Sequence, residues 1–215
     1  MKNARLFKNL DTENINQISM HLNYEKYRKK AKQKVDLDEN KYYFINHGQC
    51  LLSATDNVNV HYETIIDDTM VIATKLISER YNFMYRLTFI DNTILYCIAK
   101  DDLYTLLNEQ VNTAPFFNCI IEGMENSFER LGIHIASLQI YPAEERMYSF
   151  LQGVAYLKEN GDYEVNVSRK KLGEMVNLRR ETSGRVLKKM EINGDIEDGE
   201  GSVIKVNKSA NKLYS

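Results

Sequence analysis

Residues 167–196 constrain this chain more than any other segment, because they predict two short helices joined by a tight turn; their sequence is VSRKKLGEMVNLRRETSGRVLKKMEINGDI. Ser168 is suited to the N-cap of the first helix, since its hydroxyl can accept a hydrogen bond from the free amides of the first turn. Leu172, Met175 and Val176 then recur at the spacing of one helical face. Asn177 follows where the chain must turn, and asparagine tolerates the left-handed conformation.

The second predicted helix combines a buried side with an unusual set of charges. Val186, Leu187 and Met190 form its apolar side, and the window from Ser168 to Lys189 carries eight basic and two acidic side chains, about +6 in a chain of net charge −2. A basic helix is often only a solvated surface, so charge alone does not decide its role. Holding duplex DNA, however, requires a basic patch. In a helix-turn-helix, the first residues of the second helix meet base edges.

Arg180, Glu181 and Arg185, in the first turns of the second predicted helix, suit base recognition. Arginine matches the O6 and N7 acceptors of guanine, and a carboxylate can accept from the cytosine amino group. Residues 180–190, RETSGRVLKKM, resemble the recognition helix of the CRP/FNR family of bacterial transcription regulators, and Leu172–Val176 resembles the helix before it. The match is with the catabolite activator branch, since the fumarate–nitrate branch lacks the first arginine. One departure is Asn177, where the family usually has glycine, and another is Arg179, where a small residue is common.

The resemblance implies a division of labour among these side chains. Base reading is expected from Arg180, Glu181 and Arg185. Contacts to the DNA backbone are expected by resemblance from Ser168, Arg169 and Thr182. Lys170, Arg179 and Ser183 are expected as further DNA contacts, with Arg179 touching either a phosphate or a base. Asn193-Gly194 predicts the end of the second helix, and residues 196–206 alternate like a short hairpin, which would be the wing. The alternative is a structural three-helix unit with a charged surface.

The first half of the chain predicts antiparallel strands after a short helical lead at residues 6–22. Its apolar runs are short, rich in aromatic and β-branched residues, and separated by Asn, Asp and His-Gly; they are Lys41–Ile45, Gln49–Ala54, Val58–Thr64, Met70–Leu76, Phe83–Phe89 and Thr93–Ile98. This order resembles the double-stranded β-roll of the same family, with Tyr42–Gln49 similar to its aromatic-x-glycine strand. The predicted fold class is therefore α+β, with a β-roll related to cyclic-nucleotide-binding domains at residues 1–112.

A short helix at Asp101–Leu107 and a long helix from Thr113 to about Leu138 follow. Apolar residues recur along the long helix at spacings of three and four: Phe117, Ile120, Ile121, Met124, Phe128, Leu131, Ile135 and Leu138. This pattern is close to a coiled-coil seam. A stripe of this kind is most often core, but here we interpret residues 113–140 as a dimerisation helix, because a major-groove reader gains affinity from paired half-sites. Tyr141-Pro142 ends the helix, and residues 141–215 form the predicted winged helix-turn-helix, beginning with a helix over Ala143–Leu157.

Other chemistry finds little support in the sequence. The family's cyclic-nucleotide cassette, Gly-Glu followed by Arg-Ser/Thr-Ala, is missing from residues 69–90, and only Ser127 lies near the family's adenine-binding pair. Three separated cysteines (Cys50, Cys97, Cys119) argue against a disulfide framework and an iron–sulfur cluster. The four histidines (His21, His47, His61, His134) lack metal-binding spacing. We therefore expect no cofactor, no metal and no enzymatic activity.

The sequence thus predicts a cytoplasmic, homodimeric transcription regulator that binds double-stranded DNA independently of cyclic nucleotides. No segment suggests a membrane span. Residues 1–139 hold 15 basic and 18 acidic side chains and residues 140–215 hold 13 and 12, so we expect the nucleic-acid signal only in the C-terminal part. Two alternatives stay open: a redox or small-molecule sensor using its cysteines or β-roll, and a protein-interaction module with vestigial DNA binding. Whether the Lys158–Asp162 turn contacts RNA polymerase, and whether an unknown effector exists, also stays open.

Overall fold

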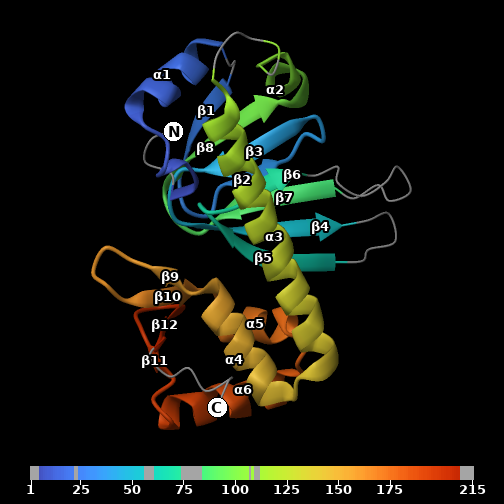
Figure 1. Ribbon diagram of the computed structural model, residues 1–215. Helices are drawn as coiled ribbons and strands as arrows, with labels where there is room; N and C mark the ends of the chain where they lie inside the picture. The colour runs from blue at the N-terminus through green and yellow to red at the C-terminus, as the bar shows by residue number, and fades with distance from the viewer. Residues whose placement is uncertain are drawn as a thin grey trace. The chain divides into compact units, whose positions relative to one another are not determined.

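The chain divides into two compact units, Met1–Phe128 and Glu129–Ser215, in a computed structural model that describes residues 5–21, 24–55, 61–73, 84–106, 108 and 112–208. The division falls inside one long helix, α3 (Ala114–Ile140), rather than at its ends (Figure 1). Each unit has its own sheets and its own core.

Unit 1 contains two four-stranded antiparallel sheets. The first has the strand order β1-β8-β3-β6, from Tyr24–Lys29, Thr93–Ala99, Lys41–Ile45 and Val71–Ala73. The second has the order β2-β7-β4-β5, from Lys34–Asp36, Met84–Phe89, Gln49–Thr55 and His61–Asp67. Six of these strands match the predicted runs, although β5 ends three residues later than expected. Residues 58–60 and 74–76, the remainder of two predicted runs, lie outside the described residues.

Alternation along the strands builds the interior of unit 1. One core cluster joins Tyr43, Ile45, Leu95 and Cys97 of the first sheet to Cys50, Ile66, Leu87 and Phe89 of the second, so the two sheets pack face to face. Alternate residues of the first sheet point the other way, to a second cluster that includes Phe44, Tyr96 and Ile98. The 3₁₀ turn η1 (Arg5–Phe7) and the helices α1 (Thr12–His21), α2 (Lys100–Leu106) and α3 cover that face (Figure 1). The helices agree with the predicted lead, short helix and long helix.

Strands β1 and β2 were not predicted. β1 reads YEKYRK, with no apolar alternation, and its pairing with β8 over Tyr24↔Ile98 to Lys29↔Thr93 supplies backbone hydrogen bonds that do not depend on apolar side chains. β2 pairs with β7 through three residues, Lys34 to Asp36. Both strands therefore depend on pairing with distant segments rather than on a local pattern.

Unit 2 contains the end of α3, three further helices and a four-stranded sheet. Its helices are α4 (Ala143–Val154), α5 (Arg169–Met175) and α6 (Arg180–Ile192). The sheet has the order β11-β12-β10-β9, from Ile196–Asp198, Val203–Val206, Tyr163–Asn166 and Tyr156–Leu157. The predicted end of the long helix before Pro142, the two-helix motif and the hairpin at residues 196–206 are all present.

Candidate nucleic-acid interface

The first helix of the motif begins and ends as its sequence predicts. Ser168 is the N-cap of α5, and its hydroxyl accepts a hydrogen bond from the Lys171 amide at 3.3 Å. Leu172, Met175 and Val176 are buried, so the spacing of apolar residues does mark the core side. This cap fixes the hydroxyl of Ser168 at the helix start.

The turn between the helices is fixed by backbone and side-chain bonds together. Asn177 has φ 52°, the left-handed conformation expected of it, and the Leu178 amide donates to the Gly173 carbonyl at 2.8 Å. Arg146 of α4 donates to the carbonyls of Val176 at 3.2 Å and Tyr141 at 3.1 Å. The sequence did not single out this arginine. Its position directly before Met147 and Tyr148, which are buried, is the one feature that sets it apart.

Gly173 and Ser183 mark the close approach of α5 to α6. A Cβ atom on Gly173 would lie 2.8 Å from the Ser183 Oγ, so the crossing requires glycine. The Ser183 side chain is 3% exposed and lies in this crossing. The prediction that Ser183 contacts DNA is corrected here, since its side chain faces α5 rather than solvent. Thr182, the neighbouring predicted contact, is half-buried.

Helix α6 presents the predicted base-reading residues on its solvent side. Val186, Leu187 and Met190 are buried, whereas Arg179, Arg180, Glu181 and Arg185 are exposed in its first two turns. Arg179 is the N-cap residue, and its carbonyl accepts from the Ser183 amide at 2.9 Å. The buried stripe therefore fixes which side of α6 a ligand could meet.

The eight basic residues of the motif fall into two groups. Four are paired: Arg169 with Glu191 and Asp198, Lys170 and Lys171 with Glu174 at 3.7 and 3.6 Å, and Lys189 with Glu144 at 2.6 Å. Within the described part of the chain, the side chains of Arg179, Arg180, Arg185 and Lys188 form no ion pair or hydrogen bond. All four unpaired cations belong to α6 or its N-cap. The local excess of positive charge therefore lies on α6.

Helix α3 splits the predicted dimer stripe into two sets. Phe117, Ile120 and Met124 pack with the second core cluster of unit 1, and Gly123 lies against Val71 and Leu6. For Ile120 the interface prediction is therefore corrected, because the β-roll buries it, whereas Phe117 and Met124 are only partly buried. Ile121, Phe128 and Ile135 are exposed by 52%, 54% and 47%. Successive members of this set are seven residues apart. The half-buried Leu131 lies between Phe128 and Ile135 in the sequence, and the half-buried Leu138 follows Ile135.

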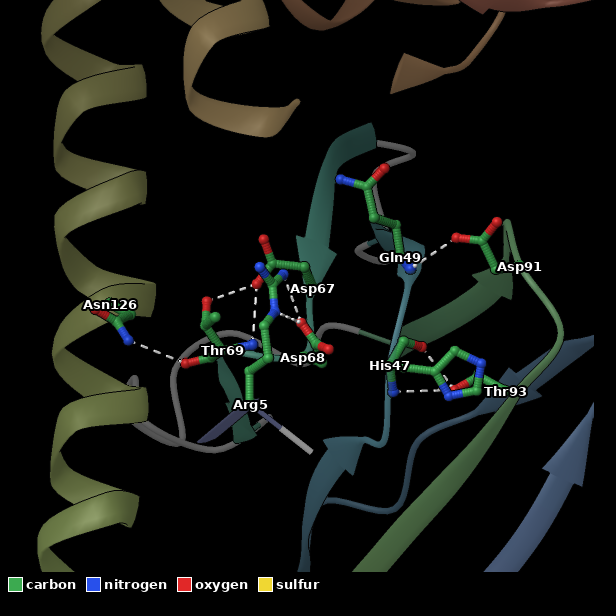
Figure 2. A network of polar contacts seen from close by, with 9 residues as sticks. All are labelled: Arg5, His47, Gln49, Asp67, Asp68, Thr69, Asp91, Thr93 and Asn126. Carbon is green, nitrogen blue, oxygen red and sulfur yellow. Dashed lines mark hydrogen bonds and ion pairs between the residues drawn. The ribbon is translucent and has the colours of Figure 1, made fainter. Parts of the chain in front are cut away.

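A polar network holds the β5–β6 turn of unit 1 from two sides (Figure 2). Arg5 of η1 pairs with the buried Asp68 at 2.6 Å, and the Thr69 hydroxyl donates to Asp67 at 2.6 Å. From α3, Asn126 donates to the Thr69 carbonyl at 3.0 Å, and the Ser127 Oγ lies 3.1 Å from the Val71 carbonyl. Ser127, the residue nearest to the family's adenine-binding pair, is therefore engaged with this chain's own backbone.

The same view shows the neighbouring β3–β4 turn, where Gly48 has φ +83° (Figure 2). A Cβ on Gly48 would lie 2.8 Å from Asp91 Oδ2, an atom that accepts from the Gln49 amide at 3.2 Å. Thr93 completes the turn by donating to the His47 carbonyl at 2.7 Å. The aromatic-x-glycine resemblance at Tyr42–Gln49 thus falls on a turn that needs glycine.

All three cysteines lie in the interior of the protein. Cys50, Cys97 and Cys119 are buried and form no disulfide with one another, and burial raises the pKa of Cys50 and of Cys119. No group of three His, Cys, Asp or Glu side chains among the described residues could hold a metal ion. No helix among them is long and apolar enough to cross a membrane. Residues 74–83, part of the stretch where a phosphate cassette would fall, lie outside the described residues.

Solved structures share this architecture along most of the chain. CLP, named as the c-di-GMP-responsive global regulator of Xanthomonas campestris, matches with a TM-score of 0.65 and 17% identity over 91% of this chain and 99% of its own. FixK2 from Bradyrhizobium japonicum matches with a TM-score of 0.64 and 14% identity, over 87% and 94%. A CRP/FNR-family transcriptional regulator from Eubacterium rectale gives 0.61 and 15%, over 97% and 96%. No family model and no curated protein sequence matches the chain.

These likenesses define the class of fold: an α+β protein with a β-roll, a long helix and a C-terminal winged helix-turn-helix. The fold is that of the CRP/FNR transcription regulators. The resemblance first seen in α5 and α6 thus extends to the architecture of the described residues. The roles of individual side chains stay predictions.

Proposed function

We propose that this chain is a sequence-specific DNA-binding transcription regulator that acts in the cytoplasm. The observation that carries the proposal is the set of unpaired cations (Arg179, Arg180, Arg185, Lys188) on α6, within a helix-turn-helix that belongs to a CRP/FNR-type fold. An exposed, uncompensated arginine pair at the start of a recognition helix suits major-groove reading. In this proposal residues 1–112 are a sensor-like domain, 113–140 the dimerisation helix and 141–215 the DNA-binding domain.

The proposed active form is a homodimer. The exposed Ile121, Phe128 and Ile135 occupy one position of a heptad, and Met124, Leu131 and Leu138 occupy the complementary position of the same repeat. A seam of this kind is buried when a second copy of the helix packs against it. A two-fold dimer reads two half-sites centred about one helical turn apart. By resemblance, each half-site would be similar to TGTGA.

Loss of a base-reading side chain and loss of a side chain that contacts the DNA backbone should change binding in different ways, and this difference tests the proposal. Arg180→Ala or Arg185→Ala should each cost roughly 1–3 kcal/mol and relax specificity at one base pair. Lys188→Ala, an exposed cation later on α6, should weaken all sequences alike and reduce the salt slope by about one. Measuring affinity for the operator and for single-base variants at several salt concentrations separates the two. Loss of base preference in the lysine variant alone would contradict the assignment.

We propose that cyclic nucleotides do not control this protein. Ser127 is engaged with the Val71 and Gly123 carbonyls, and Asn126 with the Thr69 carbonyl, so α3 uses its polar side chains to hold its own β-roll. A ligand at 100 times its Kd stabilises the native state by roughly 2.7 kcal/mol. Adding cyclic AMP or cyclic GMP should therefore leave both the melting temperature and the operator affinity unchanged. A clear thermal shift with either would contradict this part of the proposal.

An effector of another class is the second candidate. Buried thiols with raised pKa values hold little thiolate and react slowly, which disfavours a cysteine redox sensor. Operator binding by protein purified without additives, compared with binding in the presence of a cell extract or thiol reductant, tests for an effector. Binding without additives fits a constitutive regulator, whereas binding only with extract or reductant contradicts it. Contact of the Lys158–Asp162 turn with RNA polymerase stays a prediction by resemblance.

A further inference from the structure

Arg146 of α4 binds two backbone carbonyls that are far apart in the sequence. Its Nη1 atom donates to the Val176 carbonyl at 3.2 Å, and its Nη2 atom donates to the Tyr141 carbonyl at 3.1 Å. Tyr141 directly follows α3, whereas Val176 is the C-cap residue of α5. The Nε atom of Arg146 is buried, so the base of the guanidinium lies inside unit 2. One side chain therefore joins the end of the long helix to the turn of the helix-turn-helix.

Both carbonyls lie at the C-terminal end of a helix, where they need a donor. The last carbonyls of an α-helix have no amide partner within the helix, and this end carries the negative pole of the helix dipole. Among the described residues, no backbone amide donates to the carbonyl of Tyr141 or of Val176. A guanidinium satisfies two such carbonyls at once, because its N–H groups diverge in one plane with fixed geometry. Hydrogen bonds from a charged donor are also roughly twice as strong as neutral ones.

Two other contacts that join the helices of unit 2 are less directional. The ring centres of His134 on α3 and Phe150 on α4 lie 5.4 Å apart, and Glu144 of α4 pairs with Lys189 of α6 at 2.6 Å. A ring contact tolerates some rotation of one helix against the other, and an exposed ion pair is screened by salt and contributes little. Two hydrogen bonds from one planar guanidinium restrict such a rotation more strongly. Arg146 is thus placed to fix the angle between the end of α3 and the helix-turn-helix.

We propose that Arg146 is a positioning residue that sets the half-site spacing accepted by the dimer. This inference rests on the proposed function, in which two copies pair along α3 and each α6 enters the major groove. Leu131, Ile135 and Leu138 of the proposed seam belong to unit 2, as do Arg146 and α6, so the direction of α6 from the seam is set within one unit. A shift of one base pair rotates a half-site by about 35° around the duplex axis. A fixed angle should therefore make the dimer selective for spacing.

Duplexes that differ only in half-site spacing provide the test. The full-length protein is titrated with the two-fold operator and with duplexes whose half-sites lie one base pair closer together or further apart. The wild type should prefer the original spacing by at least about tenfold, since a displaced half-site loses base contacts of at least this worth. Arg146→Met removes both hydrogen bonds and keeps an unbranched side chain. It should bind the original spacing more weakly and the altered spacings about as well as the wild type does, so that the preference largely disappears.

Spacing preference separates positioning from stability. A loss of stability alone lowers the affinity for every spacing by the same factor and leaves the preference unchanged. Arg146→Lys, whose ammonium lacks the planar fork, should show an intermediate preference. Base preference within each half-site should stay that of the wild type in both variants, because the side chains of α6 are unchanged. Retained base preference also shows that the variants fold, and Arg146→Lys decides the test where Arg146→Met does not fold.

Gln152→Met is the matched control. Gln152 also lies on α4, and its side chain donates to the Asn207 carbonyl at 3.1 Å, which follows β12 rather than a helix. This variant should keep the full spacing preference.

Three results would overturn the proposal. The first is an equal loss of affinity at all spacings in the Arg146 variants, since Arg146 would then only stabilise unit 2. The second is a wild type that binds all spacings alike, and the third is a preference that Gln152→Met removes equally. Failure of the wild type to bind any two-fold operator would instead contradict the proposed function.

Discussion

Arg169, the first residue of α5, is paired with Asp198 of the wing at 2.5 Å and also with Glu191 near the end of α6. The guanidinium predicted to contact a DNA phosphate is thus already held by two carboxylates of the same unit. A phosphate must compete with these carboxylates, and the wing itself is acidic, with Glu197, Asp198 and Glu200 close together in sequence.

Removing the Asp198 charge should therefore strengthen DNA binding. We expect Asp198→Asn to raise operator affinity by about 0.2–1 kcal/mol, the range of exposed ion pairs, and to steepen the salt slope. Arg169→Ala should then cost more affinity in the Asp198→Asn background than in the wild type. Asp162→Asn is the control, since Asp162 is paired with Lys205 at 2.6 Å in the same unit. Weaker operator binding by Asp198→Asn would show that the pair positions the wing rather than withholding Arg169.

The exposed heptad position on α3 predicts the effect of a charge on dimerisation. Phe128→Asp should dissociate the dimer, because it places a carboxylate in the apolar seam, where an unpaired charge is costly. Ile133→Asp is the control: Ile133 is 50% exposed on the same helix but lies outside the repeat of Ile121, Phe128 and Ile135. Molar mass by sedimentation should report a monomer for Phe128→Asp and a dimer for Ile133→Asp. Dimers in both variants would place the interface elsewhere.

The crossing of α5 and α6 predicts opposite effects for two glycines. Gly173→Ala should destabilise the protein by about 1–3 kcal/mol, since the new methyl group would overlap Ser183. Gly184→Ala should be neutral or stabilising by up to about 1 kcal/mol, because nothing lies within 4 Å of a Cβ there and alanine favours helix. Urea unfolding measures both, and Ser183→Gly should restore part of the stability of Gly173→Ala. Equal stability of the two alanine variants would contradict the packing described here.

How far the sequence could predict this molecule differs between the two units. The helix-turn-helix was predictable because its determinants are local: the Ser168 cap, the left-handed Asn177 and the apolar side of α6 all lie within one segment. The pairing of Arg169 with Glu191 and Asp198 was not predictable, because these residues lie 22 and 29 positions further along the chain. On α3, a period of three to four cannot distinguish Ile120, which the β-roll covers, from Ile121, which stays exposed.

The strands show the same limit. Lys41–Ile45 and Gln49–Thr55 have apolar runs and were predicted nearly to the residue. β1 and β2 lie in the lysine-rich stretch and exist because β8 and β7 provide partners for their backbone groups. Ser183 was predicted to contact DNA, whereas helix packing turns its side chain inward. Non-local pairing and packing decide these positions.

The buried His134 predicts a pH dependence of stability. It is 8% exposed, its ring centre lies 5.4 Å from that of Phe150, and burial lowers its pKa below the usual 6.5. Below pH 6.5 the unfolded chain binds a proton that the native state excludes, so this residue's contribution to stability is present above that pH and is lost as the pH falls towards the native pKa.

Unfolding by urea at about pH 7.5 and about pH 5.5 should reveal this effect. The wild type should lose more stability between these values than His134→Gln. His47→Gln is the control, since His47 is exposed, and it should retain the wild-type loss. An identical pH dependence in the His134 and His47 variants would contradict the role given to burial.

Selection of binding sites from random duplexes tests the central claim most directly. Full-length protein, purified without additives, is allowed to choose among random sequences, and the recovered duplexes are aligned. Because Arg180, Glu181 and Arg185 share the exposed side of α6, we predict a two-fold site with TGTGA-like half-sites centred about one helical turn apart. Arg185→Ala should relax one base pair in each half-site. Recovery of an unrelated consensus, or of no consensus at all, would contradict the account.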